Sequence, residues 1–371
     1  MMPIYSAIER RSIYAEAALS VNARGQRMPL IGAYRGIPNG KIEAREALMI
    51  VFTRRALTLA AFLVALIGIL ADSAAAEEIG TEAKPLVIGT VRFFGFLPAY
   101  RIADQLKSQG IATKIVEFPS ATERLEAVAA GYAHISYAGL TASILLRARG
   151  KNVVIVASTN EKGRALVGKP DIVDVKALRG KKIGVTFGSI EQMTLIAELR
   201  MNGLDPHKDV TLINMPVTDM PVAFDGGSID AYMGFEPWAT FGEQKFGAKV
   251  LSYPFDTPLG AIDSGVETTE DFIKARPDLV NAVVAAHVAA VKYYRAHPDD
   301  IIKAGVDSYK VPESVMRAAM SNVELTYAIN SDHIKALGDF LVEMNFLKPE
   351  ELKSIDWAKF INPSFVEAAQ N

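Results

Sequence analysis

The sequence predicts an α/β protein with two lobes, each a mostly parallel sheet flanked by helices. From Pro85 onward, short apolar runs alternate with helical patterns of about ten residues, which is typical of sheets covered on both faces. One unit occurs twice, over residues 116–139 and 213–234, as strand, apolar–proline pair, helix, glycine, short strand and glycine. Because the unit recurs only twice, it indicates two similar lobes in tandem rather than a solenoid.

The first lobe is expected to begin with a buried strand over residues 85–91. Further strands are expected at 112–117, 134–137 and 153–157, and helices at 99–109 and 141–149. Between them, Ser120 and Glu123 form a capping box, which predicts a helix that ends at Gly131.

The second lobe repeats this local chemistry, and the chain then becomes helical. A strand that starts at Lys181 runs into another capping box, formed by Ser189 and Gln192. Amphipathic helices are expected over residues 277–296, 312–327 and 331–345, and this helical layer should pack on the sheet of the first lobe. His287 lies on an apolar helical stripe and is expected to be a hydrogen-bonded core residue.

Residues 49–76 have the three parts of a signal peptide. Arg54 and Arg55 precede the uncharged run 56–71, and an A-x-A cleavage site ends at Ala76. The run is shorter than the ~20 residues that span a bilayer, so cleavage is favoured over a retained anchor. Residues 1–48 show no sustained period and are expected to be a disordered upstream extension from a misplaced start codon. The arginine pair leaves general secretion and twin-arginine export both open.

The composition of the chain limits the classes of function that it can have. A net charge of −2 gives no indication of nucleic-acid or anionic-membrane binding. The absence of cysteine excludes disulfides, thiolate metal sites and cysteine nucleophiles, and the five histidines have no metal-ligand spacing. No P-loop, G-x-S-x-G, H-E-x-x-H or G-x-G-x-x-G motif is present, so we expect neither catalytic residues, nor a cofactor, nor a metal.

Candidate ligand-binding residues follow from position, since open α/β sheets bind ligands beyond the carboxyl ends of their strands. Helix N-termini at these turns offer free N–H groups to anions. The candidates are Arg92, Phe94, Ser120, Tyr137, Gly139, Thr141, Ser189, Glu236 and Trp238. For Ser120 and Ser189, capping of their own helices is the alternative. Glu236 and Trp238 would receive an amine-bearing ligand, or else complement a helix dipole and pack in the core.

Several segments in register resemble the substrate-binding proteins of nitrate/sulfonate/taurine-type ABC importers, and the related group that binds thiamine-pyrimidine precursors. They are Val116–Ser120, Leu125–Gly131, Ala177–Val185, Asp230–Trp238 and Gly247–Leu251. The resemblance covers most of residues 84–345. It implies a two-lobed periplasmic binding protein fold (type II) with two crossover strands, with residues 77–169 plus 256–371 in lobe 1 and 170–255 in lobe 2.

The resemblance implies a periplasmic monomer that captures a small organic solute by hinge closure and delivers it to an inner-membrane ABC permease with its ATPase. Phe93, Phe94 and Phe96 depart from the polar opening loop of that family and favour a ligand with an apolar or aromatic portion, such as a sulfonate or pyrimidine. Arg92 is available for an acidic group. An enzyme related to pyrimidine-precursor synthases, or a ligand-sensing domain for a signalling partner, are the alternatives.

Overall fold

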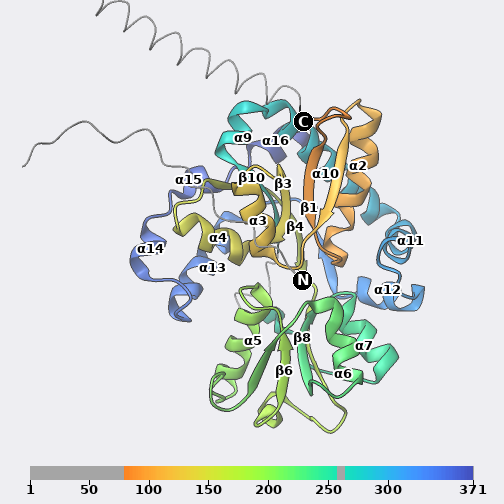
Figure 1. Cartoon of the computed structure of the whole chain (residues 1–371), viewed down its shortest axis with the longest axis vertical. Helices are drawn as coiled ribbons and strands as arrows, with labels where there is room; N and C mark the ends of the chain where they lie inside the picture. The colour runs from red at the N-terminus through yellow and green to blue at the C-terminus, as the bar shows by residue number, and fades with distance from the viewer. Residues whose placement is uncertain (1–78, 257–263, 371) are drawn as a thin grey trace, which may run out of the picture. The chain divides into compact units, whose positions relative to one another are not determined.

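The computed structural model describes residues 79–256 and 264–370. Within these ranges one sheet has six strands in the order β11-β4-β10-β3-β1-β2, and another has five in the order β7-β6-β8-β5-β9 (Figure 1). The predicted signal peptide, its cleavage site at Ala76 and the upstream extension lie outside the described residues. None of the described helices is long and apolar enough to cross a membrane.

The six-stranded sheet combines strands from both ends of the described chain. Its strands are β1 (Leu86–Thr90), β2 (Thr113–Glu117), β3 (Ile135–Gly139), β4 (Val153–Lys162), β10 (Ser264–Thr269) and β11 (Val323–Leu325). Its nearby helices include α2 (Leu97–Ser108), α3 (Ala121–Ala129), α4 (Leu140–Ala148), α9 (Glu270–Ala275) and α10 (Pro277–Ala296). The predicted helix over residues 277–296 therefore has the predicted bounds.

The five-stranded sheet lies within one continuous stretch. Its strands are β5 (Arg164–Gly168), β6 (Lys182–Val185), β7 (Thr211–Asn214), β8 (Ala231–Phe235) and β9 (Lys249–Ser252). Its helices are α5 (Ile190–Met201), α6 (Met220–Asp225) and α7 (Trp238–Phe246), and short 3-10 turns occur at η2 (Val175–Leu178), η3 (Val217–Asp219) and η4 (Pro254–Asp256).

The chain changes sheets at Gly163, earlier than the predicted boundary after residue 169. β4 belongs to the first sheet, whereas β5 pairs with β8 and β9 in the second. Gly163 has a φ of +96°, a left-handed conformation that favours glycine. A Cβ atom there would lie 3.2 Å from the Phe93 ring, so the turn is also tightly packed.

Both sheets contain parallel and antiparallel strand pairs. The repeated units pair in parallel, as in β1 with β2 and β6 with β7. In contrast, β10 runs antiparallel to β3 and β4, and β5 runs antiparallel to β8 and β9. β11 also runs antiparallel to β4, at the edge of the first sheet.

The remaining helices follow β10 in sequence. They are α11 (Pro298–Tyr309), α12 (Glu313–Met320), α13 (Ser331–Glu343), α14 (Pro349–Lys353), α15 (Trp357–Phe360) and α16 (Ser364–Gln370), together with η1 (Phe94–Phe96) earlier in the chain. As predicted, this layer packs on the first sheet, through contacts of α15 and α16 with β4. It also reaches the second sheet's helices, because Ser314 Oγ donates to Gln244 Oε1 at 3.0 Å.

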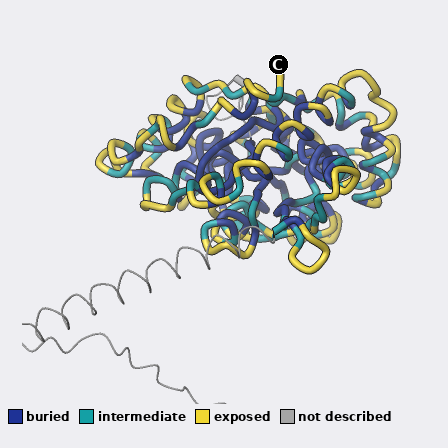
Figure 2. The backbone as a smooth tube through the Cα atoms, turned by 90° about the horizontal axis from the view of Figure 1, so that it is seen from above, coloured by how far each residue is buried: buried dark blue, intermediate teal, exposed yellow. Residues whose placement is uncertain are grey.

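One face of α10 is buried in the interior, and Figure 2 shows the buried inner segments and the exposed loop tips. His287 on α10 is completely buried, as predicted. Its Nδ1 lies 3.0 Å from the Tyr137 hydroxyl oxygen and its Nε2 lies 2.8 Å from the Ser158 carbonyl oxygen. Burial lowers the pKa of His287 to about 4, so its ring is neutral at physiological pH.

Candidate functional site

A small cavity of about 40 Å³ lies between the two sheets. We refer to it as the inner cavity. Residues from the first-sheet side include Phe93, Phe96, Ser120, Arg124 and Gly139, and residues from the second-sheet side include Ser189, Glu191, Val217 and Phe235. Its walls are therefore aromatic with a few polar groups, which is the usual composition of a small-molecule site.

Two helix N-termini meet at this cavity. Ser120 caps α3, where its Oγ accepts from Glu123 N at 3.2 Å, and Ser189 caps α5, where its Oγ accepts from Gln192 N at 3.3 Å. The serine half of each predicted capping box is confirmed, whereas Gln192 Oε1 accepts from Gly188 N at 2.8 Å rather than from the N–H of Ser189. A Cβ atom built on Gly188 would lie 3.6 Å from Thr122 Oγ1, so the two helix starts approach each other closely.

Arg124 supplies a buried positive charge to the inner cavity, where Glu267, Glu191 and Glu123 are the carboxyl groups that act on it. Arg124 is 3% exposed, and its Nη1 donates to the Phe118 carbonyl oxygen at 3.2 Å. Its Nε has no hydrogen-bond partner among the described residues. Burial lowers the pKa of Arg124 to about 10, so the guanidinium is still protonated at neutral pH.

Sequence reasoning missed Arg124, although it lies on α3 four residues after the predicted cap Ser120. The signal that would have found it is an arginine beside the apolar stripe in the first turns of a helix that follows a strand end. Such an arginine is next to the expected ligand position and can direct its side chain toward it.

Glu191, which lines the cavity from the second-sheet side, belongs to a buried ion pair. Arg164 is completely buried, and its Nε lies 3.4 Å from Glu191 Oε1. Burial also lowers the pKa of Arg164 to about 10. Glu191 is therefore paired with Arg164, and its charge also acts on Arg124.

A buried carboxyl group connects β3 to α4 next to the site. Glu267 on β10 accepts from Ala138 N at 3.1 Å and from Ser143 Oγ at 3.1 Å. These bonds join the end of β3, where Gly139 lines the inner cavity, to the first turns of α4. Burial raises the pKa of Glu267 well above its ordinary value.

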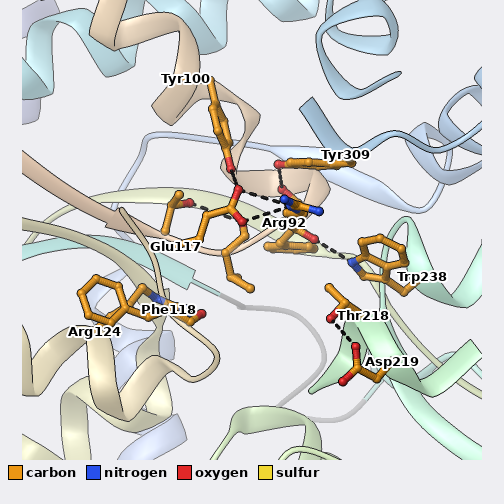
Figure 3. Close-up of polar contacts among 12 residues, drawn as sticks. Arg92, Tyr100, Glu117, Phe118, Arg124, Thr218, Asp219, Trp238 and Tyr309 are labelled. Carbon is orange, nitrogen blue, oxygen red and sulfur yellow. Dashed lines mark hydrogen bonds and ion pairs between the residues drawn. The ribbon is translucent and has the colours of Figure 1, made fainter. Parts of the chain in front are cut away.

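A larger outer cavity of about 270 Å³ adjoins the inner one and shares Val91, Pro119 and Val217 with it. Arg92, predicted to meet an acidic ligand group, lines this outer cavity and forms an ion pair with Glu117 at 3.0 Å. The Tyr100 hydroxyl donates to Glu117 Oε1 at 2.9 Å (Figure 3). Arg92 is thus already neutralised by the protein itself.

Several predicted site residues lie elsewhere. Ser120, Gly139 and Ser189 line the inner cavity and Arg92 the outer one, whereas Phe94, Tyr137, Thr141, Glu236 and Trp238 line neither. Phe94 packs in the core and lines a separate hollow beside α10 to α12. Tyr137 bonds to His287, and Thr141 is completely buried. Phe93 and Phe96 take the aromatic position expected for Phe94, because the η1 turn directs their side chains to the cavity.

Glu236 and Trp238 connect the two sheets rather than face the cavities. Glu236 Oε1 accepts from Asn322 Nδ2 at 2.7 Å, and its Oε2 accepts from Thr240 N at 3.1 Å. Trp238 Nε1 donates to the Arg92 carbonyl oxygen at 2.7 Å. Their side chains are thereby occupied within the protein, which favours the core interpretation of this pair.

The buried carboxyl of Glu236 makes stability depend on pH. Burial raises its pKa from 4.5 to about 7. Folding therefore favours the protonated form, and the contribution is lost as pH rises from about 4.5 through 7. At about 1.4 kcal/mol per pKa unit, the loss reaches about 3 kcal/mol. Urea unfolding of the wild type and Glu236→Gln should show their stability difference change by this amount between pH 4.5 and 8. The exposed Glu82→Gln is the control, and a difference that is flat with pH would refute the assignment.

In the described part of the chain, no cluster of three or more His, Asp or Glu side chains is arranged to hold a metal ion. The inner cavity instead combines a buried guanidinium, two helix N-termini and aromatic walls. This arrangement can bind a small anionic group and shield an apolar portion next to it.

Comparison with known proteins places the chain in a family. A protein of Bacillus subtilis (strain 168) named "Putative aliphatic sulfonates-binding protein" is 28% identical over 270 residues, which are 72% of this chain and 81% of the relative. The "Taurine-binding periplasmic protein" of Escherichia coli (strain K12) is 28% identical over 202 residues, covering 53% of this chain and 62% of the relative.

Solved structures confirm the fold. The alkanesulfonate-binding protein SsuA from Xanthomonas axonopodis pv. citri, bound to MOPS, has a TM-score of 0.65 at 19% identity and covers 75% of this chain and 98% of its own. The predicted two-lobed α/β periplasmic binding protein fold is therefore correct. The family described as "NMT1/THI5 like" matches residues 105–301, over half of the sequence. The chain belongs to the NMT1/THI5-like family.

Proposed function

We propose that this chain is the extracytoplasmic solute-binding component of an ABC importer, and that its solute is a small organic anion. The observation that carries the proposal is Arg124, a buried guanidinium with an unpartnered Nε at a cavity lined from both sheets. A buried charge of this kind is costly unless a ligand or partner compensates it. The names of the sulfonate- and taurine-binding relatives support the same class of solute.

The mode of action is binding without chemical change. A solute held between α3 and α5 would contact both sheets, and such contacts stabilise a closed arrangement by differential affinity. The closed protein would then deliver the solute to a membrane permease with its ATPase. The predicted signal peptide supports a periplasmic protein that begins at Glu77, and we propose that it acts as a monomer.

The aromatic walls narrow the solute further. Phe93, Phe96 and Phe235 surround the inner cavity, and the Phe93 and Phe235 ring centroids are 4.9 Å apart. An inorganic anion alone would make no apolar contact with the ring surfaces that line the cavity. We therefore favour an organic sulfonate or a related anion with an apolar body over nitrate.

Titration calorimetry tests the proposal on mature protein purified from the periplasmic fraction of a Gram-negative host, where N-terminal sequencing should read from Glu77. The panel contains butanesulfonate, benzenesulfonate, nitrate, a pyrimidine and the cation spermidine. We expect the organic sulfonates to bind and to be recovered unchanged, and spermidine not to bind. Failure of every organic anion to bind, or conversion of a bound compound to a product, would overturn the proposal.

A further inference from the structure

Glu267 is an ionisable group that lies beside the inner cavity without lining it. It is completely buried on β10, and α3, which carries Arg124, contacts β10. Each of its carboxyl oxygens accepts a hydrogen bond, Oε1 from Ser143 Oγ and Oε2 from Ala138 N, both at 3.1 Å. Ala138 precedes Gly139, which lines the inner cavity, so the carboxyl group is held behind the cavity wall.

Two opposite effects act on the protonation of Glu267. Burial disfavours the carboxylate and raises the pKa of Glu267 well above its ordinary value. The hydrogen bonds from Ser143 and Ala138 and the charge of Arg124 favour the carboxylate and act to lower that pKa. Because both oxygens already accept a bond, the carboxylate is the form that fits these donors. Glu267 therefore depends on Arg124 for part of the compensation of its charge.

The other elements packed against β10 present neutral side chains to Glu267. The charge of Glu267 acts on the Tyr137 phenol of β3, and burial raises the pKa of Tyr137, so this phenol stays neutral. Helix α4 contributes the Ser143 hydroxyl, and β4 contributes Ile155, the register partner of Glu267. Arg124 is therefore the charged side chain through which an event in the inner cavity reaches Glu267.

We propose that Glu267 takes up a proton when an anionic solute binds at Arg124, so that solute affinity falls as pH rises. The bound anion compensates the charge of Arg124, which then stabilises the Glu267 carboxylate less, and the buried carboxylate binds a proton more readily. By reciprocity, the protein with a protonated Glu267 binds the anion more tightly than the protein with an ionised one. The proposal rests on the proposed function, because it needs an anion in the inner cavity.

The effect occurs between the pKa of Glu267 in the free protein and its higher pKa in the complex. Since burial raises both values, this range lies above the ordinary range of carboxyl groups. A nearby opposite charge lowers a carboxyl pKa by roughly 1–3 units, so partial loss of the Arg124 attraction should raise the pKa of Glu267 by about one unit. A change of one unit corresponds to about tenfold in affinity.

Calorimetric titration of the full mature protein with benzenesulfonate tests the proposal, because a sulfonate stays ionised over the whole range from about pH 5.5 to about pH 9. At each pH, two buffers with different ionisation enthalpies report the number of protons taken up. We expect the wild type to take up as much as one proton within this range and to lose about tenfold in affinity across it. Glu267→Gln, which resembles the protonated group, should take up none and should keep the low-pH affinity of the wild type at every pH.

Ser143→Ala is a second variant, which removes one donor that favours the carboxylate and should therefore move the proton uptake to higher pH. Glu126→Gln removes an exposed carboxyl group from α3 and is the control that should keep the wild-type uptake. Binding of benzenesulfonate without proton uptake, or unchanged uptake in Glu267→Gln, would overturn the inference while the proposed function stands. If Glu267→Gln fails to fold, uptake at an unshifted pH in Ser143→Ala overturns it instead. If no organic anion binds, both fail.

Discussion

Replacing Arg124 by methionine is expected to weaken binding of an organic sulfonate by about 10- to 150-fold. This range corresponds to the ~1.5–3 kcal/mol that a hydrogen bond to a charged group contributes. Nε of Arg124 has no hydrogen-bond partner among the described residues, so a bound anion could accept a charge-assisted hydrogen bond from it. Methionine fills much of the same space without a charge. Calorimetric titration of the two proteins with benzenesulfonate measures the effect.

The same substitution should not lower the melting temperature of the unliganded protein. Arg124 donates one hydrogen bond within the described residues, to the Phe118 carbonyl oxygen, and is attracted by Glu267 and Glu191. Methionine loses these interactions but also removes the desolvation cost of a buried guanidinium, and we expect the two effects to offset each other. The exposed Arg149→Met, at the end of α4, serves as the control and should change neither quantity. Unchanged affinity in Arg124→Met, or a large fall in its melting temperature, would show that Arg124 has a purely structural role.

The elements that sequence predicts best are those with local signals. Ser120 and Ser189 each accept a bond from the backbone three residues later, and that spacing is readable in the sequence. The 277–296 helix is bounded by prolines and carries a regular apolar stripe, so its limits were predictable as well. The burial of His287 was predictable from the same apolar stripe.

The charged part of the site depends on tertiary contacts that leave little trace in the sequence. An arginine on a short amphipathic helix is ordinarily solvent-exposed, and Arg124 is buried because Phe118 and Phe96 pack near it. The Arg164–Glu191 pair joins β5 to α5, and no local pattern links those positions. Similarly, the turn at η1 decides that Phe93 rather than Phe94 lines the inner cavity.

The predicted boundary after residue 169 missed the change of sheet at Gly163 for a related reason. β4 and β5 are separated by a single residue, so the apolar pattern continues across the change of sheet without a loop signal. Only the pairing partners distinguish them, since β4 pairs with β10 and β5 with β8.

Trp238→Ala is expected to cost ~3–5 kcal/mol of folding free energy, as is typical when a buried aromatic side chain is truncated. The Trp238 residue is 7% exposed, and its Nε1 donates to the Arg92 carbonyl oxygen across the two sheets. Its ring also packs edge-on against Phe241, with centroids 6.2 Å apart. Because Trp238 lines neither cavity, solute affinity well below the melting temperature should change little. Urea unfolding and calorimetric titration of the same preparation measure the two quantities.

Phe235→Ala provides the opposite pattern and makes the result decisive. Phe235 lies at the end of β8, three residues before Trp238, and its side chain is only partly buried at the wall of the inner cavity. Its truncation should reduce sulfonate affinity more than stability, because the ring would cover the apolar body of the solute. The alternative, in which the indole of Trp238 stacks on the solute, requires the reverse: Trp238→Ala would lose affinity while keeping most of its stability. The two substitutions lie in one segment, so a difference in their pattern reports which aromatic side chain faces the solute and which one joins the sheets.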